Sequence, residues 1–192
     1  MASDERIAAI LTFMDQANRL KDTLRSGHTP EGRQESTAEH TWRLCLMVML
    51  FGEELQGVDL FRLIKICLVH DLGEAISGDI PAIHQRADDD RAARERADLV
   101  TLCAPLPVDL RAEIIALWDD YAAGGSPEAV LAKGFDKIET MLTHSTGRNA
   151  ADFDYGFNLD YGRAATARHA LLAAIRAQVD ERTRALDQKT GA

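Results

Sequence analysis

Apolar residues recur along this chain at intervals of three and four positions, which is the spacing of amphipathic helices, and strand-type alternation is scarce. The pattern predicts a first helix over residues 4–19, followed by a loop that contains Gly27, Pro30 and Gly32. Residues 145–158 are also expected to form a loop. Further helices are expected over residues 36–55, 59–70, 108–121, 126–144 and 160–186.

Capping signals mark the starts of three of these helices. Ser36 precedes Glu39 by three positions, which is the spacing of a capping box. Asp59 stands where an N-cap carboxylate is expected, and Ser126 precedes a proline at the first helical position. The local sequence therefore predicts where these helices begin.

One charge-dense segment, residues 85–98, has two interpretations. Charge runs of this kind usually form a solvated helix face, and this interpretation is favoured. The alternative is a mobile flap beside a functional site.

The chain has 192 residues, of which 46% are apolar, so it fits one domain with a sizeable core. We expect a single all-α helical bundle over residues 1–192, with a core over about residues 20–145 and a C-terminal helix over about 160–186. The longest apolar run, residues 44–51, is too short to span a bilayer, and the charged start of the chain does not resemble a signal peptide. A cytoplasmic protein without a membrane partner is therefore expected.

The formal net charge of −9 disfavours a nucleic-acid polymer as a partner, because such polymers are bound by basic surfaces. A small phosphorylated ligand stays open, since a metal and a few arginines can reverse the potential inside one pocket. The cysteines, Cys45, Cys67 and Cys103, lack C-x-x-C spacing. They are expected to be reduced and buried, with neither a disulfide nor a soft-metal site.

His40 lies at one end of an apolar stripe on the second predicted helix. The stripe continues at helical spacing through Leu44, Met47, Phe51 and Leu55. A lone histidine on such a face is usually a core residue whose nitrogens are bonded to its neighbours. The alternative role is a metal ligand, and only the rest of the sequence distinguishes the two.

The third predicted helix has a face that begins apolar and ends polar. Leu63 and Cys67 are followed on it by His70, Asp71 and Glu74, if the helix continues that far. Charged groups are rarely buried without a partner or a metal. A polar cluster facing water is the alternative, and the apolar run before His70 disfavours it.

Asp136 also has two interpretations. It is either a surface carboxylate paired with Lys133 or Lys137, or a ligand that points inward. Gly134 stands two residues earlier in the middle of the predicted helix, where glycine costs about 1 kcal/mol relative to alanine. Close packing or access to a site would explain that glycine and favours the inward role.

Two imidazoles and two carboxylates can hold a divalent metal through nitrogen and oxygen donors, and a metal with open positions can activate water for hydrolysis. The set His40, His70, Asp71 and Asp136 resembles the H…HD…D pattern of HD-domain metal-dependent phosphohydrolases. Over about residues 20–142 the chain is similar to the compact 5′-deoxynucleotidase group of that family. Three motifs carry the resemblance: Glu39-His40, the string H-D-x-x-E-A-x-x-G-D-I at residues 70–80, and the D-K-x-E segment at residues 136–139.

The resemblance implies an HD-domain fold and one divalent metal ion, which could be Mn, Co, Fe, Ni, Zn or Mg, held by those four residues. It implies that Glu74 is the catalytic acid–base residue and that Asp79 contacts the sugar hydroxyl in the catalytic site. Arg25 and Arg33 stand where the family places basic residues near the substrate phosphate. In one close branch an aromatic residue follows the first arginine, and here Ser26 stands at that position. The resemblance also suggests a homodimer.

The sequence thus predicts a metal-dependent phosphomonoester hydrolase acting on small-molecule nucleoside 5′-monophosphates, with deoxyribonucleotides preferred. A 3′-phosphate placed beside Asp79 would be repelled, so 3′-monophosphates should be spared.

Two alternatives stay open: hydrolysis of another nucleotide or phosphorylated metabolite, and a non-enzymatic regulator with the HD fold. Ala75 stands where alarmone hydrolases usually carry a second acid, and the Gly-Tyr-Pro signature of cyclic dinucleotide hydrolases is absent from the sequence. Triphosphohydrolases of deoxynucleotides are normally longer. A regulator should have lost a ligand or Glu74, and all of them are present.

Overall fold

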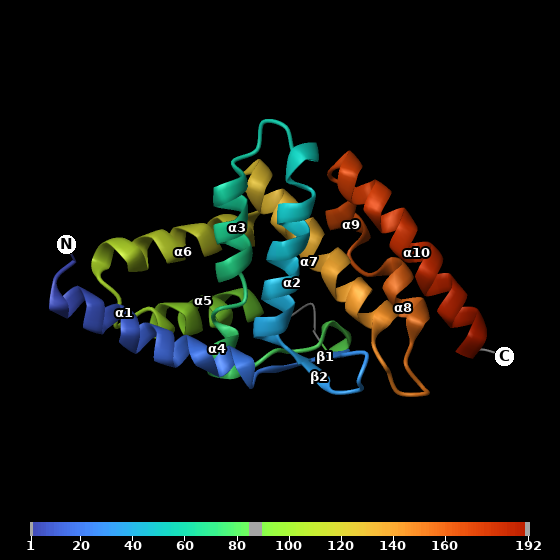
Figure 1. The fold of residues 1–192 in the computed structure, drawn as a ribbon, viewed down its shortest axis with the longest axis horizontal. Coiled ribbons are helices and arrows are strands. Elements are labelled where there is room, and N and C mark those ends of the chain that lie inside the picture. Colours follow the sequence, from blue (N-terminus) through green and yellow to red (C-terminus); the bar gives the residue numbers. More distant parts are fainter. Residues whose placement is uncertain (1, 85–89, 191–192) are drawn as a thin grey trace.

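The structure is a computed structural model and describes residues 2–84 and 90–190. Most of these residues are helical, and this part of the chain contains one two-stranded hairpin (Figure 1). The all-α prediction is therefore confirmed. The first elements are α1 (Asp4–Ala17), η1 (Asn18–Lys21), β1 (Leu24–His28), β2 (Gln34–Ser36), α2 (Thr37–Leu50), η2 (Gly52–Glu54), α3 (Leu60–Val69), α4 (Glu74–Ser77) and η3 (Ala82–His84), where η denotes a short 3₁₀ helix. The later elements are α5 (Arg91–Leu102), α6 (Val108–Ala123), α7 (Pro127–Thr146), α8 (Tyr155–Asp160), α9 (Arg163–Thr166) and α10 (Ala170–Thr190).

The predicted capping residues begin their helices as expected. The Ser36 hydroxyl accepts a hydrogen bond from the backbone N–H of Glu39, and the Glu39 carboxylate accepts one from the N–H of Ser36, which completes the capping box of α2. Asp59 caps α3 through the N–H of Arg62, and Ser126 caps α7. These contacts fix the starts of the three helices that carry or precede the candidate ligands.

Part of the loop predicted after the first helix is instead an antiparallel hairpin of β1 and β2. Leu24 pairs with Ser36, and His28 pairs with Gln34. The strands are held by backbone hydrogen bonds and carry mostly polar side chains, so no apolar alternation marks them in the sequence. Strand β1 carries Arg25 and packs against α7.

The prediction of one continuous helix over residues 160–186 is wrong. Helix α8 ends at Asp160, α9 is one turn long, and α10 begins only at Ala170. Gly162 interrupts the helical path with a φ of 68°, a left-handed conformation that favours glycine. A Cβ atom on this glycine would lie 2.6 Å from Cβ of Lys137, so glycine also allows this segment to approach α7 closely.

The favoured interpretation of the charged segment is confirmed over residues 91–98, which belong to α5. Only Leu99 and Leu102 of this helix are buried, and both lie beyond the charge-dense part. Residues 85–89 of the segment lie outside the described residues, so the mobile flap stays a hypothesis.

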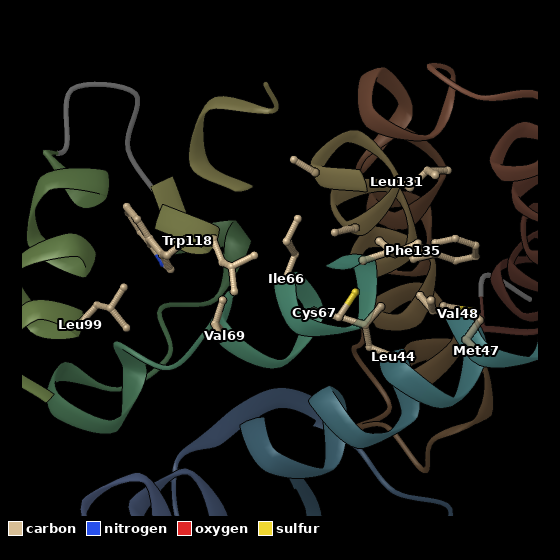
Figure 2. Packing of buried hydrophobic residues seen from close by; sticks show 14 of the residues in the cluster. Leu44, Met47, Val48, Ile66, Cys67, Val69, Leu99, Trp118, Leu131 and Phe135 are labelled. Carbon is tan, nitrogen blue, oxygen red and sulfur yellow. The ribbon is translucent and has the colours of Figure 1, made fainter. Parts of the chain in front are cut away.

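Helix α7 lies at the centre of the fold, behind α2 and α3 and beside α10 in Figure 1. The predicted stripe is confirmed over α2, where His40 and Leu44 are fully buried and Met47 nearly so. The helix ends at Leu50, so the last two predicted positions, Phe51 and Leu55, lie beyond it and are partly buried and buried, respectively. Cys67 and Cys103 are buried and Cys45 partly buried, all three as free thiols. Figure 2 shows how the buried side chains of the three central helices meet: Leu44, Met47 and Val48 from α2, Ile66 and Cys67 from α3, and Leu131 and Phe135 from α7.

The mid-helix glycine of α7 is explained by close packing. A Cβ atom on Gly134 would overlap the buried side chain of Leu172 on α10. None of the helices in the described part of the chain combines the length and apolar character needed to cross a bilayer.

Candidate metal and catalytic site

The structure brings the four predicted ligands together from three places in the chain. His40 lies in the first turn of α2, His70 and Asp71 follow the end of α3, and Asp136 lies in the middle of α7. Nε2 of His40 lies 3.4 Å from Nε2 of His70 and 3.3 Å from Oδ1 of Asp136. Nε2 of His70 lies 3.0 Å from Oδ2 of Asp71. The donor atoms of His40, His70 and Asp71 all lie within 4.8 Å of one another, so these three residues could hold one metal ion. Asp136 adjoins the group through its Oδ1, which lies 3.9 Å from Nε2 of His70.

The outer nitrogens of both imidazoles are already bonded, which fixes how the rings face the cluster. Nδ1 of His40 is bonded to the Glu139 carboxylate, and Nδ1 of His70 donates to the carbonyl oxygen of Cys67 at 2.8 Å. Each ring therefore turns Nε2 toward the other donors. This is the usual arrangement of histidines that ligate a metal.

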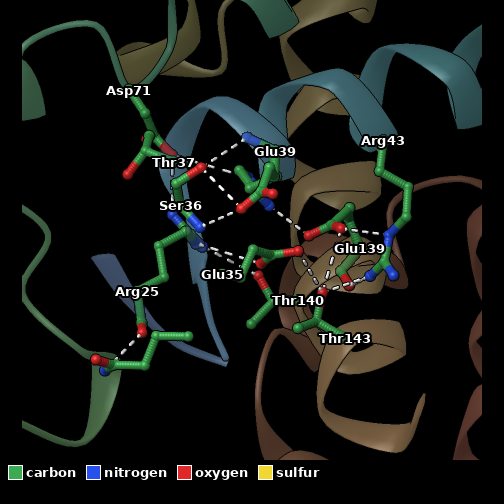
Figure 3. Close-up of polar contacts among 12 residues, drawn as sticks. Arg25, Glu35, Ser36, Thr37, Glu39, Arg43, Asp71, Glu139, Thr140 and Thr143 are labelled. Carbon is green, nitrogen blue, oxygen red and sulfur yellow. Dashed lines mark hydrogen bonds and ion pairs between the residues drawn. The ribbon is translucent and has the colours of Figure 1, made fainter. Parts of the chain in front are cut away.

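A polar network behind the cluster holds Glu139 in place (Figure 3). Nε of Arg43 donates to the Glu139 carboxylate at 2.7 Å, and a second nitrogen of Arg43 donates to the hydroxyl of Thr143. Thr143 also donates to Glu35 at 3.1 Å. Because Glu139 is fully buried, its charge depends on His40 and Arg43 for compensation.

The two predicted carboxylate ligands each contact a cation. Asp71 lies 3.1 Å from a guanidinium nitrogen of Arg25. In Asp136, Oδ1 faces His40, while Oδ2 accepts hydrogen bonds from Lys137 at 2.8 Å and from the Tyr121 hydroxyl at 2.9 Å. Asp136 is thus a buried residue that also pairs with Lys137, which combines the two predicted interpretations.

The electrostatics of the cluster favour a bound cation. Burial and Arg25 both lower the pKa of His40, but the carboxylates of Glu139 and Asp136 outweigh them and raise it to about 10. Burial alone would raise the pKa of Asp136, but Lys137 and the two imidazoles hold it well below its usual value. The carboxyl groups of Asp136 and Glu139 are therefore ionised at neutral pH, and a divalent metal would take the place of the proton on His40.

A cavity of about 410 Å³ opens beside the cluster. It is lined by His70, Asp71 and Asp136, and also by Glu74, Asp79 and Arg25. Aromatic side chains also line it, among them Phe153 and Phe157 of the segment around α8, together with Tyr161.

Glu74 is set for proton transfer at the edge of this cavity. It opens α4, and its carboxylate accepts a hydrogen bond from the Thr37 hydroxyl at 2.8 Å. Burial and repulsion from Asp71 raise the pKa of Glu74 to about 9. Burial also raises the pKa of Asp79, although Arg25 opposes the shift. Each carboxyl group therefore holds a proton more readily than it would in water.

The two predicted arginines have different positions. Arg25 lines the cavity and contacts both Asp71 and the hydroxyl of Thr140. Arg33 is exposed, is paired with Glu39 at 2.5 Å, and is not among the residues that line the cavity. The structure does not bring Arg33 to the candidate site, because its guanidinium group is paired with the Glu39 carboxylate of the α2 capping box.

Sequence reasoning missed several residues of the site. Lys137 and Glu139 lie in the D-K-x-E segment, where their spacing from Asp136 was a usable signal. Thr37 could have been predicted as a site residue, because it lies in the first turn of α2 together with His40. Tyr121 reaches Asp136 from α6, and no pattern in the sequence indicates that contact.

Comparison with known proteins agrees with this geometry. The profile of the HD domain family matches residues 17–176. The chain is 31% identical over 147 residues to mouse 5′-deoxynucleotidase HDDC2, covering 76% of this chain and 73% of the relative. It is 33% identical over 139 residues to Schizosaccharomyces pombe 5′-deoxynucleotidase hdd1, covering 69% of each chain.

Solved structures show the same arrangement of helices. A crystal structure of a predicted metal-dependent phosphohydrolase from Magnetospirillum magnetotacticum MS-1 matches with a TM-score of 0.77 and 28% identity, over 94% of each chain. The PH0347 protein from Pyrococcus horikoshii, at 22% identity and a TM-score of 0.59, shares the fold. Because the family profile matches most of the sequence, the chain belongs to the HD domain family.

Proposed function

We propose that this protein is a metal-dependent phosphohydrolase that releases phosphate from nucleoside 5′-monophosphates, with deoxyribonucleotides preferred. The observation that carries the proposal is the cluster of His40, His70 and Asp71, with Asp136 beside it, next to the partly buried carboxyl group of Glu74 at the wall of one cavity. The relatives named 5′-deoxynucleotidases support the class of substrate.

The residues present fit a divalent metal through His40, His70, Asp71 and Asp136, since their donor atoms converge and both imidazoles present Nε2. When bound, the metal supplies a Lewis acid for a phosphate oxygen and lowers the pKa of water. Mixed nitrogen and oxygen ligation suits Mn, Co, Fe, Ni, Zn or Mg.

Glu74 moves the proton in this proposal. A divalent cation bound beside it would oppose the raised pKa of Glu74 and favour the ionised form. The carboxylate can then accept a proton from the attacking water, and the resulting carboxylic acid donates one to the departing 5′-oxygen. The new bond joins the water oxygen to phosphorus, and the bond between phosphorus and the 5′-oxygen breaks, which leaves a nucleoside and inorganic phosphate. Thr37 holds the carboxyl group in place through its hydroxyl.

Arg25 and Asp79 bind the substrate at its two polar ends. The guanidinium of Arg25 suits paired hydrogen bonds to phosphate oxygens, and it already lies beside Asp71 in the cavity. Asp79 would accept a hydrogen bond from a free 3′-hydroxyl and repel a 3′-phosphate. This contact supports cleavage of the 5′ ester alone.

Two measurements test the function together. Metal content and far-UV circular dichroism of Asp71→Ala should show lost metal with helices retained, and Asp109→Ala, a surface carboxylate paired with Arg6, serves as the matched control. Phosphate release should be faster from 5′- than from 3′-monophosphates, and Asp79→Ala should reduce that difference. Full metal retention in Asp71→Ala would refute the ligand set, and equal cleavage of both esters would refute the substrate assignment.

We also propose that the protein is a homodimer. Helices α2 and α3 pack side by side and expose large apolar side chains: Trp42 and Met49 on α2, and Phe61 and Leu68 on α3. A second copy would cover these side chains. Sedimentation velocity should give a dimer for the wild type and a monomer for Trp42→Glu, and a monomeric wild type would rule this assembly out.

A further inference from the structure

The cavity beside the ligand cluster extends along one face of α7. Asp136, Thr140 and His144 follow one another at helical spacing on this helix, and all three line the cavity. His144 comes eight residues after Asp136 (144 − 136), which is about 12 Å along the helix axis. The cavity therefore has a second end, well separated from the predicted metal ligands.

Aromatic rings form much of this second end. Phe153 and Phe157, from the segment around α8, line the cavity together with His144. The ring of Phe153 meets the imidazole of His144 edge to face, with 5.0 Å between the ring centres and an interplanar angle of 66°. Phe157 is stacked on Tyr161, with 5.6 Å between the ring centres. Both phenylalanines are only partly buried, so each has ring surface left for a ligand in the cavity.

Buried neighbours hold the ring of Phe153 in place. Nδ1 of His144 is bonded to Oδ1 of the buried Asn158 at 2.9 Å, which fixes the imidazole that Phe153 contacts. Phe153 also contacts the ring of the buried Tyr155, with 4.9 Å between the ring centres. The hydroxyl of Tyr155 accepts a hydrogen bond from the side chain of Asn149 at 3.1 Å. A ring fixed in this way loses little rotamer freedom when a ligand stacks on it.

The charge at this end of the cavity disfavours a phosphate group. The segment 152–157 has no basic residue, and its two carboxylates, Asp152 and Asp154, are exposed and line the cavity. Burial lowers the pKa of His144, so its imidazole is neutral at neutral pH. A phosphate placed here would be repelled by the carboxylates, whereas a neutral aromatic ring would not.

We propose that this end of the cavity is a nucleobase subsite, in which the base of the substrate stacks on Phe153 and Phe157 while its phosphate lies at the ligand cluster. The identity of that substrate rests on the proposed function. The separation of the two ends along α7 leaves room for the sugar between them. A phosphomonoester without a base would lack the stacking contact, so the subsite selects nucleotides over other phosphorylated metabolites.

Calorimetric binding of the two reaction products to the metal-loaded protein tests the two ends of the cavity separately. The probes are 2′-deoxyadenosine for the base subsite and inorganic phosphate for the ligand cluster. Phe153→Leu should weaken binding of 2′-deoxyadenosine by about 5- to 150-fold, the range for a lost stacking contact, and leave phosphate binding unchanged. Phe153→Tyr keeps the ring and should bind both probes like the wild type. Phe61→Leu is the control, because Phe61 is exposed on α3 and is not among the residues that line the cavity.

Phe157→Leu is a second variant and should show the same selective loss of 2′-deoxyadenosine binding. Unchanged affinity for 2′-deoxyadenosine in both leucine variants would overturn the proposal, as would undetectable binding of this nucleoside to the wild type. Equal losses of nucleoside and phosphate binding would also overturn it, because they would indicate a disturbed fold. The free sugar 2-deoxyribose should bind the wild type far more weakly than the nucleoside, and equal binding would assign the affinity to the sugar.

The two proposals fail in different ways. If nucleoside binding depends on Phe153 and Phe157 but no nucleotide is hydrolysed, the proposed function is wrong and the base subsite stands. If nucleotides are hydrolysed and both leucine variants bind 2′-deoxyadenosine like the wild type, the base subsite alone is wrong.

Discussion

Glu139 of α7 and His40 of α2 form a hydrogen bond across the packed faces of the two helices. The bond uses Nδ1 of the imidazole, so Nε2 remains directed at His70 and Asp136. The carboxylate is itself held by Arg43. The orientation of the His40 imidazole thus depends on Glu139, a residue outside the predicted set of metal ligands.

We expect Glu139→Gln to weaken metal binding by about 10- to 100-fold, the usual effect of losing a partner behind a ligating histidine. The glutamine keeps the shape of the side chain but removes the charge that supports His40 and Arg43. Competition with a chelator of known affinity measures the effect. Glu113→Gln on the surface is the control, and equal metal affinities in the two variants would show that Glu139 has no such role.

Glu74→Gln should retain metal and lose kcat by about 10²- to 10⁴-fold, because an amide cannot accept and return the proton. The glutamine can still accept a hydrogen bond from Thr37, so the fold and the cavity should be preserved. Steady-state kinetics with a nucleoside 5′-monophosphate measures the change. Turnover within a few-fold of the wild type would exclude the acid–base role.

The stability of the metal-free protein should depend on pH through Glu74. Burial raises the pKa of this residue from 4.5 to about 9, so the folded state holds a proton that the unfolded state releases. The stabilisation is complete below pH 4.5 and is lost as the pH rises toward 9. The Glu74→Gln variant has no proton to lose at this position, so only the wild type loses this stabilisation as the pH rises. The melting temperature of the variant minus that of the wild type should therefore increase between pH 5 and pH 9. A constant difference across that range in chelator-treated samples would contradict the assignment.

Gly134→Ala should destabilise the protein, although alanine favours helices. The new methyl group overlaps the buried Leu172, and overpacking of about 1–3 kcal/mol exceeds the gain of about 1 kcal/mol in helix propensity. Urea unfolding of the two single variants and of Gly134→Ala with Leu172→Ala gives the coupling energy. The double variant should lose less than the sum of the two, and strict additivity would show that the two residues do not compete for space.

The parts of the fold that sequence could predict are those decided by neighbouring residues. Ser36 and Glu39 cap α2 by bonding to each other, and the stripe that includes Leu44 follows from helical spacing alone. The hairpin of β1 and β2 was missed because its strands pair through the backbone. The break at Gly162 was missed because its cause, contact with Lys137, lies 25 residues away along the chain (162 − 137).

The site follows the same rule. Motif resemblance indicated His40, His70, Asp71 and Asp136, and packing of three helices then brought them together. The sequence spacing of Arg25 and Arg33 from His40 could not show that Arg33 pairs with Glu39. Both arginines lie in the same hairpin region, and only the three-dimensional course of the hairpin directs one of them away from the cavity.

The predicted ligands come from positions that are distant along the chain, since His40 and His70 alone are 30 positions apart. A metal bound there would act as a cross-link between α2, α3 and α7. Because the unfolded chain cannot assemble this set of donors, occupancy would add about 2.7 kcal/mol of stability at a free metal concentration 100 times the Kd. The lifetime of the folded protein would then depend on the metal available to it, and metal scarcity would reduce the amount of protein together with its activity.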